Sequence, residues 1–196
     1  MPEATQRIDA KRAALLVMDF QAGIVGMLEN ANTLVERAAL AIRSMRERGG
    51  HVGYVRVGFT ESEYAAIPEH NKGFSTAKSA GRAFHADAPA TAIDERLAPQ
   101  PGDIVVRKTR VGAFSTTDLA EQLRSRGVDT LILSGISTSG VVLSTIRDAA
   151  DRDFRLFVLA DACADPSPDV HALLLEQVMP RQADVISSGD LQRMLV

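Results

Sequence analysis

Three short stretches of the sequence place reactive side chains at or just after the end of an apolar run. Asp19 follows such a run in LLVMDFQAG, and Lys108 closes another in DIVVRKTR. The third stretch, SGISTSGVVLS at 134–144, is a turn rich in glycine and serine that leads directly into a helical pattern. These residue types suit acid–base chemistry, because a carboxylate can transfer a proton while an ammonium or backbone N–H groups stabilise the charge that develops.

Asp19 and Lys108 each have an ordinary structural interpretation as well. A carboxylate directly after a buried strand can cap the following helix instead of acting on a ligand. A lysine at a strand end is usually a solvated surface residue. If Lys108 points at Asp19, its ammonium keeps the carboxylate ionised and can stabilise a developing anion. The pair is therefore stronger evidence for a site than either residue alone.

The turn at 134–144 offers backbone N–H groups at a predicted helix start. Gly140 permits unusual backbone angles there, so the turn could form an oxyanion hole. The alternative is a plain helix start that the side chain of Thr138 or Ser139 caps. The spacing of the residues does not separate these two interpretations.

Strand-like apolar runs alternate with helical patterns along the chain. The strands are expected at 13–18, 51–57, 103–107, 129–134, 155–160 and 183–187, and the helices at 31–48, 115–126, 139–152 and 169–179. This alternation predicts one domain over residues 1–196: a three-layer α/β/α, Rossmann-like fold with a parallel sheet and right-handed crossovers. Ligands of such sheets bind outside the carboxyl ends of the strands, where the three reactive stretches fall.

One segment, 59–102, does not follow the alternation. It is too long for a routine connection between two strands and is rich in proline, glycine and alanine. Long insertions of this kind commonly form lids, binding loops or contacts between subunits. We expect one of these roles for it.

The composition is that of an ordinary soluble protein. Hydrophobic residues make up 45% of the 196 residues and charged residues 24%, which excludes a disordered chain. The net charge of −3, with basic residues spread along the chain, gives no electrostatic footprint for nucleic acid or an anionic membrane, so neither partner is expected. A single cysteine, Cys163, and a start without a targeting signal favour a cytoplasmic protein without disulfides.

Three motifs taken together resemble those of the isochorismatase-like hydrolases. They are MDFQ at 18–21, the pattern K-x-x-x-G-A-F-x-x-T-D-L at 108–119, and LILSGISTSGVVLSTIRDAADRDFRLFVLADAC at 131–163. The resemblance runs from about residue 13 to 187 and keeps the order of the motifs. It implies a six-stranded sheet in the order 3-2-1-4-5-6, hydrolysis of a small molecule, and a homodimer or homotetramer.

The resemblance also implies a departure at the expected nucleophile. In the amidohydrolase branches an Asp, a Lys and a Cys act together; Asp19 and Lys108 match the first two, whereas the cysteine falls on Val141. The isochorismatases have glycine at that position and cleave a vinyl ether with the Asp as general acid. Family members also place a non-proline cis peptide in this turn, which we expect between Ser139 and Gly140.

Several further residues are candidate substrate contacts. Arg56, at the end of the second strand, suits a substrate carboxylate through a bidentate contact. Phe59, Phe74 and Phe114 could line an apolar pocket, with ordinary core packing as the alternative. Gln21, the last residue of the MDFQ motif, is assigned to the same pocket.

Neither a metal nor a cofactor is expected. Nicotinamidase-like members of the family hold a zinc-type ion with an Asp and two His after the second strand, where this chain has YVRVGFTESEY. The four histidines are scattered, without the short spacing of a metal site.

Three functions stay open at this point. The first is a hydrolase that uses Asp19 and Lys108 with water, Asp19 being a general base or a general acid. The second is an amidohydrolase in which Cys163 supplies the thiol. The third is an inactive member of the fold that binds a small molecule.

Overall fold

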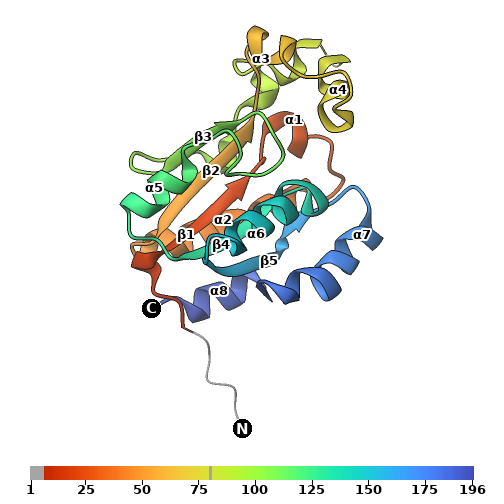
Figure 1. Cartoon of the computed structure of the whole chain (residues 1–196). Helices are drawn as coiled ribbons and strands as arrows, with labels where there is room; N and C mark the ends of the chain where they lie inside the picture. The colour runs from red at the N-terminus through yellow and green to blue at the C-terminus, as the bar shows by residue number, and fades with distance from the viewer. Residues whose placement is uncertain (1–6, 80) are drawn as a thin grey trace.

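Six parallel strands form one sheet in the order β3-β2-β1-β4-β5-β6 (Figure 1). The computed structural model describes residues 7–79 and 81–196. The strands are β1 (Ala13–Met18), β2 (His51–Val57), β3 (Ile104–Lys108), β4 (Thr130–Ile136), β5 (Arg155–Ala164) and β6 (Asp184–Ile186). The predicted fold class and strand order are confirmed, and β1 and β2 have the predicted bounds.

Helices cover both faces of the sheet. They are α2 (Ala31–Glu47) and α8 (Ser188–Met194) on one face, and α5 (Leu119–Ser125) and α6 (Leu143–Ala150) on the other. Every residue of β1 is buried, because Leu15 and Val17 pack towards α2 and α8 while Leu16 and Met18 pack towards α5 and α6. A strand buried on both faces reads as a continuous apolar run, as this one does.

The helical segments differ in detail from their predicted ranges. The predicted helix at 139–152 consists of a π-helical turn, η5 (Thr138–Val142), followed by α6. The predicted helix at 169–179 is α7 (Pro168–Leu173), continued by a second π-helical turn, η6 (Leu174–Val178). The short helix α1 (Ala22–Val25) and α8 are additional, and a capping box between Ser187 and Asp190 begins α8.

The insertion at 59–102 forms a small subdomain at the carboxyl ends of the strands (Figure 1). It contains α3 (Glu61–Ala65), α4 (Lys72–Ser79) and the 3₁₀ turns η2 (Gly81–Phe84), η3 (Pro89–Thr91) and η4 (Glu95–Leu97). A bridge between Phe59 and His85 closes it on itself, and another between Gln21 and Ile93 ties it to the segment after β1. The insertion is therefore joined to the end of the sheet where the candidate site lies.

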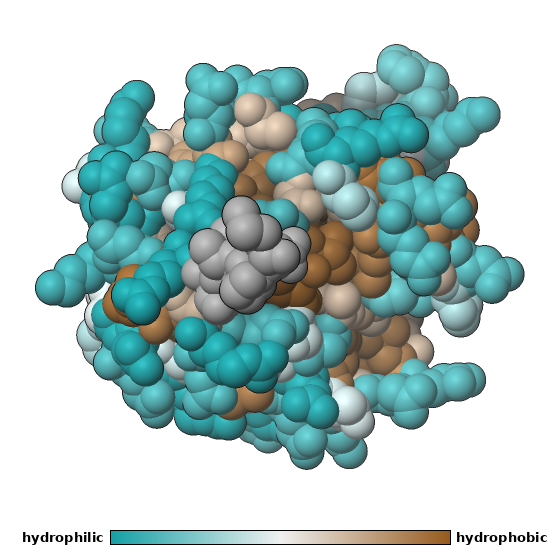
Figure 2. Space-filling model, turned by 90° about the horizontal axis from the view of Figure 1, so that it is seen from below, coloured by the Kyte–Doolittle hydropathy of each residue, from teal (hydrophilic) through white to brown (hydrophobic). Residues whose placement is uncertain are grey.

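The surface around the chain ends is largely hydrophilic, with hydrophobic residues gathered on one side of the view in Figure 2. In the part of the chain that the structure describes, no helix is both long and apolar enough to cross a membrane.

Candidate active site

Asp19 lies where the strand order reverses, next to β4 and at the carboxyl end of β1. Chain connections leave β1 towards β2 and β3 and then cross back to β4, so the ends of β1 and β4 form the switch point at which ligands of such sheets bind. The Asp19 N–H donates to the carbonyl of Val55 at 2.8 Å, and its φ of 59° is unusual for a residue other than glycine. Such backbone conformations cluster at functional sites.

The structure brings Lys108 and Asp19 together. Lys108 Nζ lies 2.8 Å from Asp19 Oδ2 and donates a second hydrogen bond to the carbonyl of Val111 at 2.9 Å. The two residues are only 2% and 5% exposed. The lysine reaches past β2 from the end of β3. The pair is therefore a buried contact within the fold, and neither residue is a solvated surface group.

The second carboxylate oxygen of Asp19 is buried and has no hydrogen-bond partner among the described residues. Burial raises the pKa of Asp19 above its ordinary value of 3.8, and the Lys108 ammonium opposes that rise. Buried polar atoms normally have partners, so an oxygen without one fits a position that meets a ligand or water. Asp19 Oδ1 is therefore the atom on which the chemistry of this site depends.

The turn after β4 is more fully hydrogen-bonded than an open oxyanion hole would be. The Ser139 N–H donates to Asp165 Oδ2 at 2.7 Å, and the Gly140 N–H donates to the hydroxyl of Ser137 at 3.1 Å. This corrects the expectation that the amides of Ser139 and Gly140 are available to a ligand. The predicted oxyanion contact then rests on the amide of Val141.

The cis peptide also differs from its predicted position. It joins Ile136 to Ser137, at the junction of β4 and the turn, and not Ser139 to Gly140.

Val141 and Phe114 lie in the apolar core on the α5 and α6 side of the sheet. Val141 is 2% exposed. The Phe114 ring stacks on Phe154 at 6.1 Å between centroids, and the Arg152 guanidinium lies 4.9 Å from its centre. Because its ring is used in these contacts, Phe114 belongs to the core, which corrects its assignment as a substrate contact.

Gln21 is a structural residue. Its amide donates to the carbonyls of Val57 at 2.8 Å and Thr91 at 2.9 Å, and its side-chain oxygen accepts from the Val57 N–H at 2.8 Å. The side chain is 1% exposed and holds the end of β2 and the insertion to the segment after β1. The expectation that Gln21 binds substrate is wrong in this geometry, because both of its amide protons are used.

Arg56 lies on the opposite face of the sheet from Lys108. Val57 is the register partner of Lys108, so Arg56, one residue earlier, points to the other face. Its guanidinium donates to the carbonyl of Ala86 at 2.9 Å and to that of Thr91 at 3.3 Å, and burial lowers its pKa. Arg56 anchors the insertion, which corrects its assignment as the carboxylate-binding residue.

Phe59 and Phe74 form an aromatic cluster inside the insertion. Phe59 is fully buried, with its ring 5.0 Å from that of Tyr64 and 5.8 Å from that of Phe74. The cluster packs around Val57, and Phe74 is only partly buried. Of the three phenylalanines proposed as substrate contacts, Phe59 and Phe114 are buried, and Phe74 is the one with a partly exposed side chain.

Cys163 lies within β5, beside Gly135 of β4, and is 5% exposed. Burial raises the pKa of its thiol to about 12. The thiol is therefore protonated at neutral pH and packs as an apolar group, whereas a reactive cysteine needs a lowered pKa and access to solvent.

Two residues of the segment after β5 position the turn and were not predicted as part of the site. Asp165 accepts from the Ser139 N–H, and His171 Nδ1 lies 2.8 Å from the hydroxyl of the fully buried Thr138. The sequence signal was the DPSPD run at 165–169, whose Asp, Ser and Pro residues are typical of turns and helix starts.

We predict that His171 makes folding stability depend on pH. Burial lowers the pKa of His171 below 6.5, so the folded state binds fewer protons and loses stability as the pH falls below 6.5. The His171→Gln variant should be less stable than the parent by about 1 kcal/mol at pH 8, and this difference should shrink at pH 5. Urea denaturation at both pH values measures it, with the exposed His70→Gln as control; an equal difference at both pH values contradicts the assignment.

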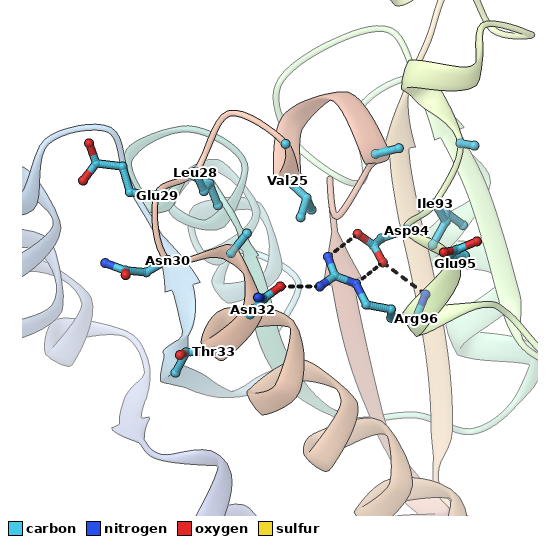
Figure 3. A pocket seen from close by; sticks show the side chains of 14 residues that line it. Val25, Leu28, Glu29, Asn30, Asn32, Thr33, Ile93, Asp94, Glu95 and Arg96 are labelled. Carbon is cyan, nitrogen blue, oxygen red and sulfur yellow. Dashed lines mark hydrogen bonds and ion pairs between the residues drawn. The ribbon is translucent and has the colours of Figure 1, made fainter.

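A separate open groove of about 890 Å³ lies between α1, the start of α2 and the 92–96 segment (Figure 3). Arg96 crosses it, bound to both Asp94 oxygens and to Asn32 (Figure 3). Neither Asp19 nor Lys108 lines this groove. The described residues that line the groove include no buried carboxylate–ammonium pair like Asp19–Lys108, and the carboxylate of Asp94 is already paired with Arg96. Among the described residues, no three His, Cys, Asp or Glu side chains form a group able to hold a metal ion.

The sequence profile of the isochorismatase domain matches residues 13–190, which is most of the chain. The chain belongs to the isochorismatase family. It is similar to the uncharacterized isochorismatase family protein YecD of Escherichia coli O157:H7, at 34% identity over 94% of this chain and 96% of that protein. It is also similar to the phenazine biosynthesis protein PhzD of Pseudomonas fluorescens, at 32% identity over 96% of this chain and 88% of that protein.

Solved structures of the isochorismatase family have the same fold. An isochorismatase family protein from Burkholderia thailandensis superposes with a TM-score of 0.83, at 27% identity, over 96% of this chain and 97% of that one. The protein is thus an isochorismatase-family hydrolase with the parallel α/β fold that its sequence predicts.

Proposed function

We propose that this hydrolase cleaves an enol-ether type C–O bond in a small carboxylate-bearing metabolite, with Asp19 as the general acid and without a thiol nucleophile. The observation that carries the proposal is the buried Asp19–Lys108 pair, in which one carboxylate oxygen meets the ammonium at 2.8 Å and the other has no partner among the described residues. One oxygen is held, and the other is left to exchange a proton with a ligand.

The chemistry needs a carboxyl group that keeps its proton at pH values above the ordinary pKa of Asp and releases it in the transition state. Burial supplies the first property, because it raises the pKa of Asp19. Lys108 supplies the second, because its ammonium stabilises the carboxylate that forms as the proton leaves. The two residues thus oppose each other in the ground state and cooperate as the charge develops.

The reaction then proceeds in three balanced steps. The Asp19 carboxyl proton moves to the terminal alkene carbon, whose π electrons form the new C–H bond, and the remaining cation is shared with the ether oxygen. Water adds to the internal alkene carbon, which bears the ether oxygen and the positive charge, and gives a proton back to the Asp19 carboxylate. The resulting hemiketal collapses, breaking the C–O bond to give a ketone and an alcohol.

Val141 favours a chemistry that needs no covalent intermediate. In the amidohydrolase branches of the family the corresponding residue is the cysteine nucleophile, and valine offers neither a nucleophile nor a proton. Similarity to a probable isochorismatase of Pseudomonas chlororaphis, at 32% identity over 94% of this chain and 86% of that protein, supports the same direction. The side chain of Val141 is buried and larger than the glycine that the isochorismatases have at this position. We therefore propose a substrate that is smaller than isochorismate.

A substrate panel tests the proposed function. Purified protein is incubated with enolpyruvyl ethers of decreasing size and with monoamides of small dicarboxylic acids, and products are measured by mass spectrometry. Cleavage of an enol ether with formation of pyruvate supports the proposal. Turnover of the amides alone contradicts the bond assignment, and binding without turnover of any compound supports an inactive binding protein.

We predict that removing the thiol leaves turnover unchanged. Cys163 is buried and protonated, so Cys163→Ala should retain the activity of the parent protein, and iodoacetamide should leave native Cys163 unmodified. Loss of activity in Cys163→Ala, with an unchanged circular dichroism spectrum, would instead favour the cysteine-dependent alternative.

A further inference from the structure

The geometry points to Arg110 as the residue that binds the carboxylate of the substrate, an inference that rests on the proposed function. Sequence reasoning gave this role to Arg56, but Arg56 lies on the far face of the sheet and donates to carbonyls of the insertion. The site is therefore left without its predicted anion contact. Arg110 is the basic residue whose position and bonding fit that role.

The first step is the charge balance at the end of β3. Of its three basic residues, Arg107 pairs with Glu63 at 2.7 Å and Lys108 pairs with Asp19 at 2.8 Å. Arg110 has no carboxylate within ion-pair distance among residues 7–79 and 81–196; one nitrogen donates to the carbonyl of Thr109, at 2.6 Å. A half-buried guanidinium without a counter-ion is costly unless an anion joins it.

The second step is the position of the loop that carries Arg110, which is attached to the catalytic pair. The carbonyl of Val111 accepts from Lys108 Nζ, so the loop that carries Arg110 bends back over the ammonium. The hydroxyl of Thr116 accepts from the Thr109 N–H at 3.0 Å and fixes the other side of the loop. The backbone next to Arg110 is thus fixed to the Lys108 ammonium, one residue after Arg110.

The third step is the contact between Arg110 and the insertion. The Arg110 guanidinium lies 5.8 Å from the centre of the Phe74 ring, and Phe74 packs on the cluster around Val57. Val57 is the register partner of Lys108, so its side chain is on the Lys108 face of the sheet. Arg110 therefore connects the loop after β3 with the insertion.

The ligand class follows from this chemistry. A guanidinium presents paired N–H donors that match a carboxylate, and a neighbouring aromatic face favours a planar, conjugated group. We expect Arg110 to select a conjugated carboxylate, such as an enolpyruvyl or aryl carboxylate, over its neutral amide.

The test uses benzoate and its neutral isostere benzamide as probes, so that binding is measured without turnover. Isothermal titration calorimetry of the intact protein should give tighter binding of benzoate than of benzamide. Arg110→Gln should weaken benzoate binding by about 10- to 100-fold and leave benzamide unchanged, because a hydrogen bond to a charged group is lost. Arg110→Lys, which keeps the charge but not the paired donors, should fall between the two.

Arg82→Gln is the matched control, since its exposed guanidinium pairs with Glu61 in the same insertion. It should bind benzoate as the parent does. Equal benzoate affinity in the parent and Arg110→Gln, or no preference of the parent for benzoate over benzamide, overturns the assignment. Failure of the proposed function has a different signature, because benzoate binding then persists while no enol ether is cleaved.

Discussion

Replacement of Asp19 by Asn should lower kcat/KM for an enol-ether substrate by about 10²- to 10⁴-fold, the range that a positioned general acid contributes. Asparagine has nearly the same shape and can still accept the hydrogen bond from Lys108, but it has no proton to transfer. Steady-state kinetics measures the loss, and circular dichroism shows whether the fold is retained.

The control for this variant is Asp129→Asn. Asp129 pairs with Arg12 next to the start of β4, at the opposite end of the sheet, and it is partly solvent-exposed. Its replacement should leave kcat/KM unchanged. If Asp19→Asn turns over substrate at the rate of the parent protein, Asp19 is not the proton donor.

The second large effect concerns the buried ion pair and stability. Lys108→Met removes the ammonium and leaves Asp19 buried without its counter-ion, which should lower the free energy of unfolding by about 3–5 kcal/mol near neutral pH. The double variant Asp19→Asn, Lys108→Met contains neither charge and should recover most of that loss. Both variants should be inactive, because each lacks part of the proton-transfer machinery.

The pH dependence of Lys108→Met follows from the same contact. Without the ammonium, the pKa of the buried Asp19 rises further above its unfolded value. Protonated Asp19 then stabilises the folded state. This stabilisation is fully present below the pKa that Asp19 has in the unfolded chain, and it is lost as the pH rises through the pKa that Asp19 has in the folded chain. Urea denaturation should therefore show a larger defect at pH 8 than at pH 5. A double variant no more stable than Lys108→Met at pH 8 contradicts the ion-pair account.

Much of the fold could be predicted from the sequence, because its main determinant is a local pattern. The apolar runs that became β1 and β2 are bounded by polar or glycine residues, and the helical pattern at 31–48 ends at a pair of glycines. The helix α8 was missed although Ser187 and Asp190 carry the signal of a capping box. This signal is only four residues long, which is why it was overlooked.

The candidate site was predictable only in part, because side-chain direction depends on register. The end of β1 and the end of β3 were located correctly, and Asp19 and Lys108 meet there. Arg56 was assigned to the site because it also lies near a strand end. Successive side chains of a strand point to opposite faces, so Arg56, one residue before the partner of Lys108, points to the other face. Gln21 and Phe114 were assigned through their motifs, and their partners, Thr91 and Phe154, lie far along the chain.

The turn after β4 illustrates a different limit. Its glycine and serine residues indicated a helix start with free amides, and either a cap or an anion site fitted the spacing. The choice depends on Asp165, which accepts from the Ser139 N–H and comes from the loop after β5. No pattern within the turn carries that information.

The measurement that tests the central claim most directly is the pH dependence of kcat/KM for a cleaved enol ether. Asp19 must be protonated to act, and burial places its pKa above 3.8. We predict that kcat/KM falls as the pH rises through the pKa of Asp19, and that the residual activity of Asp19→Asn lacks this limb. A rate that rises with pH over the same range would contradict the account, because Asp19 would then act as a base.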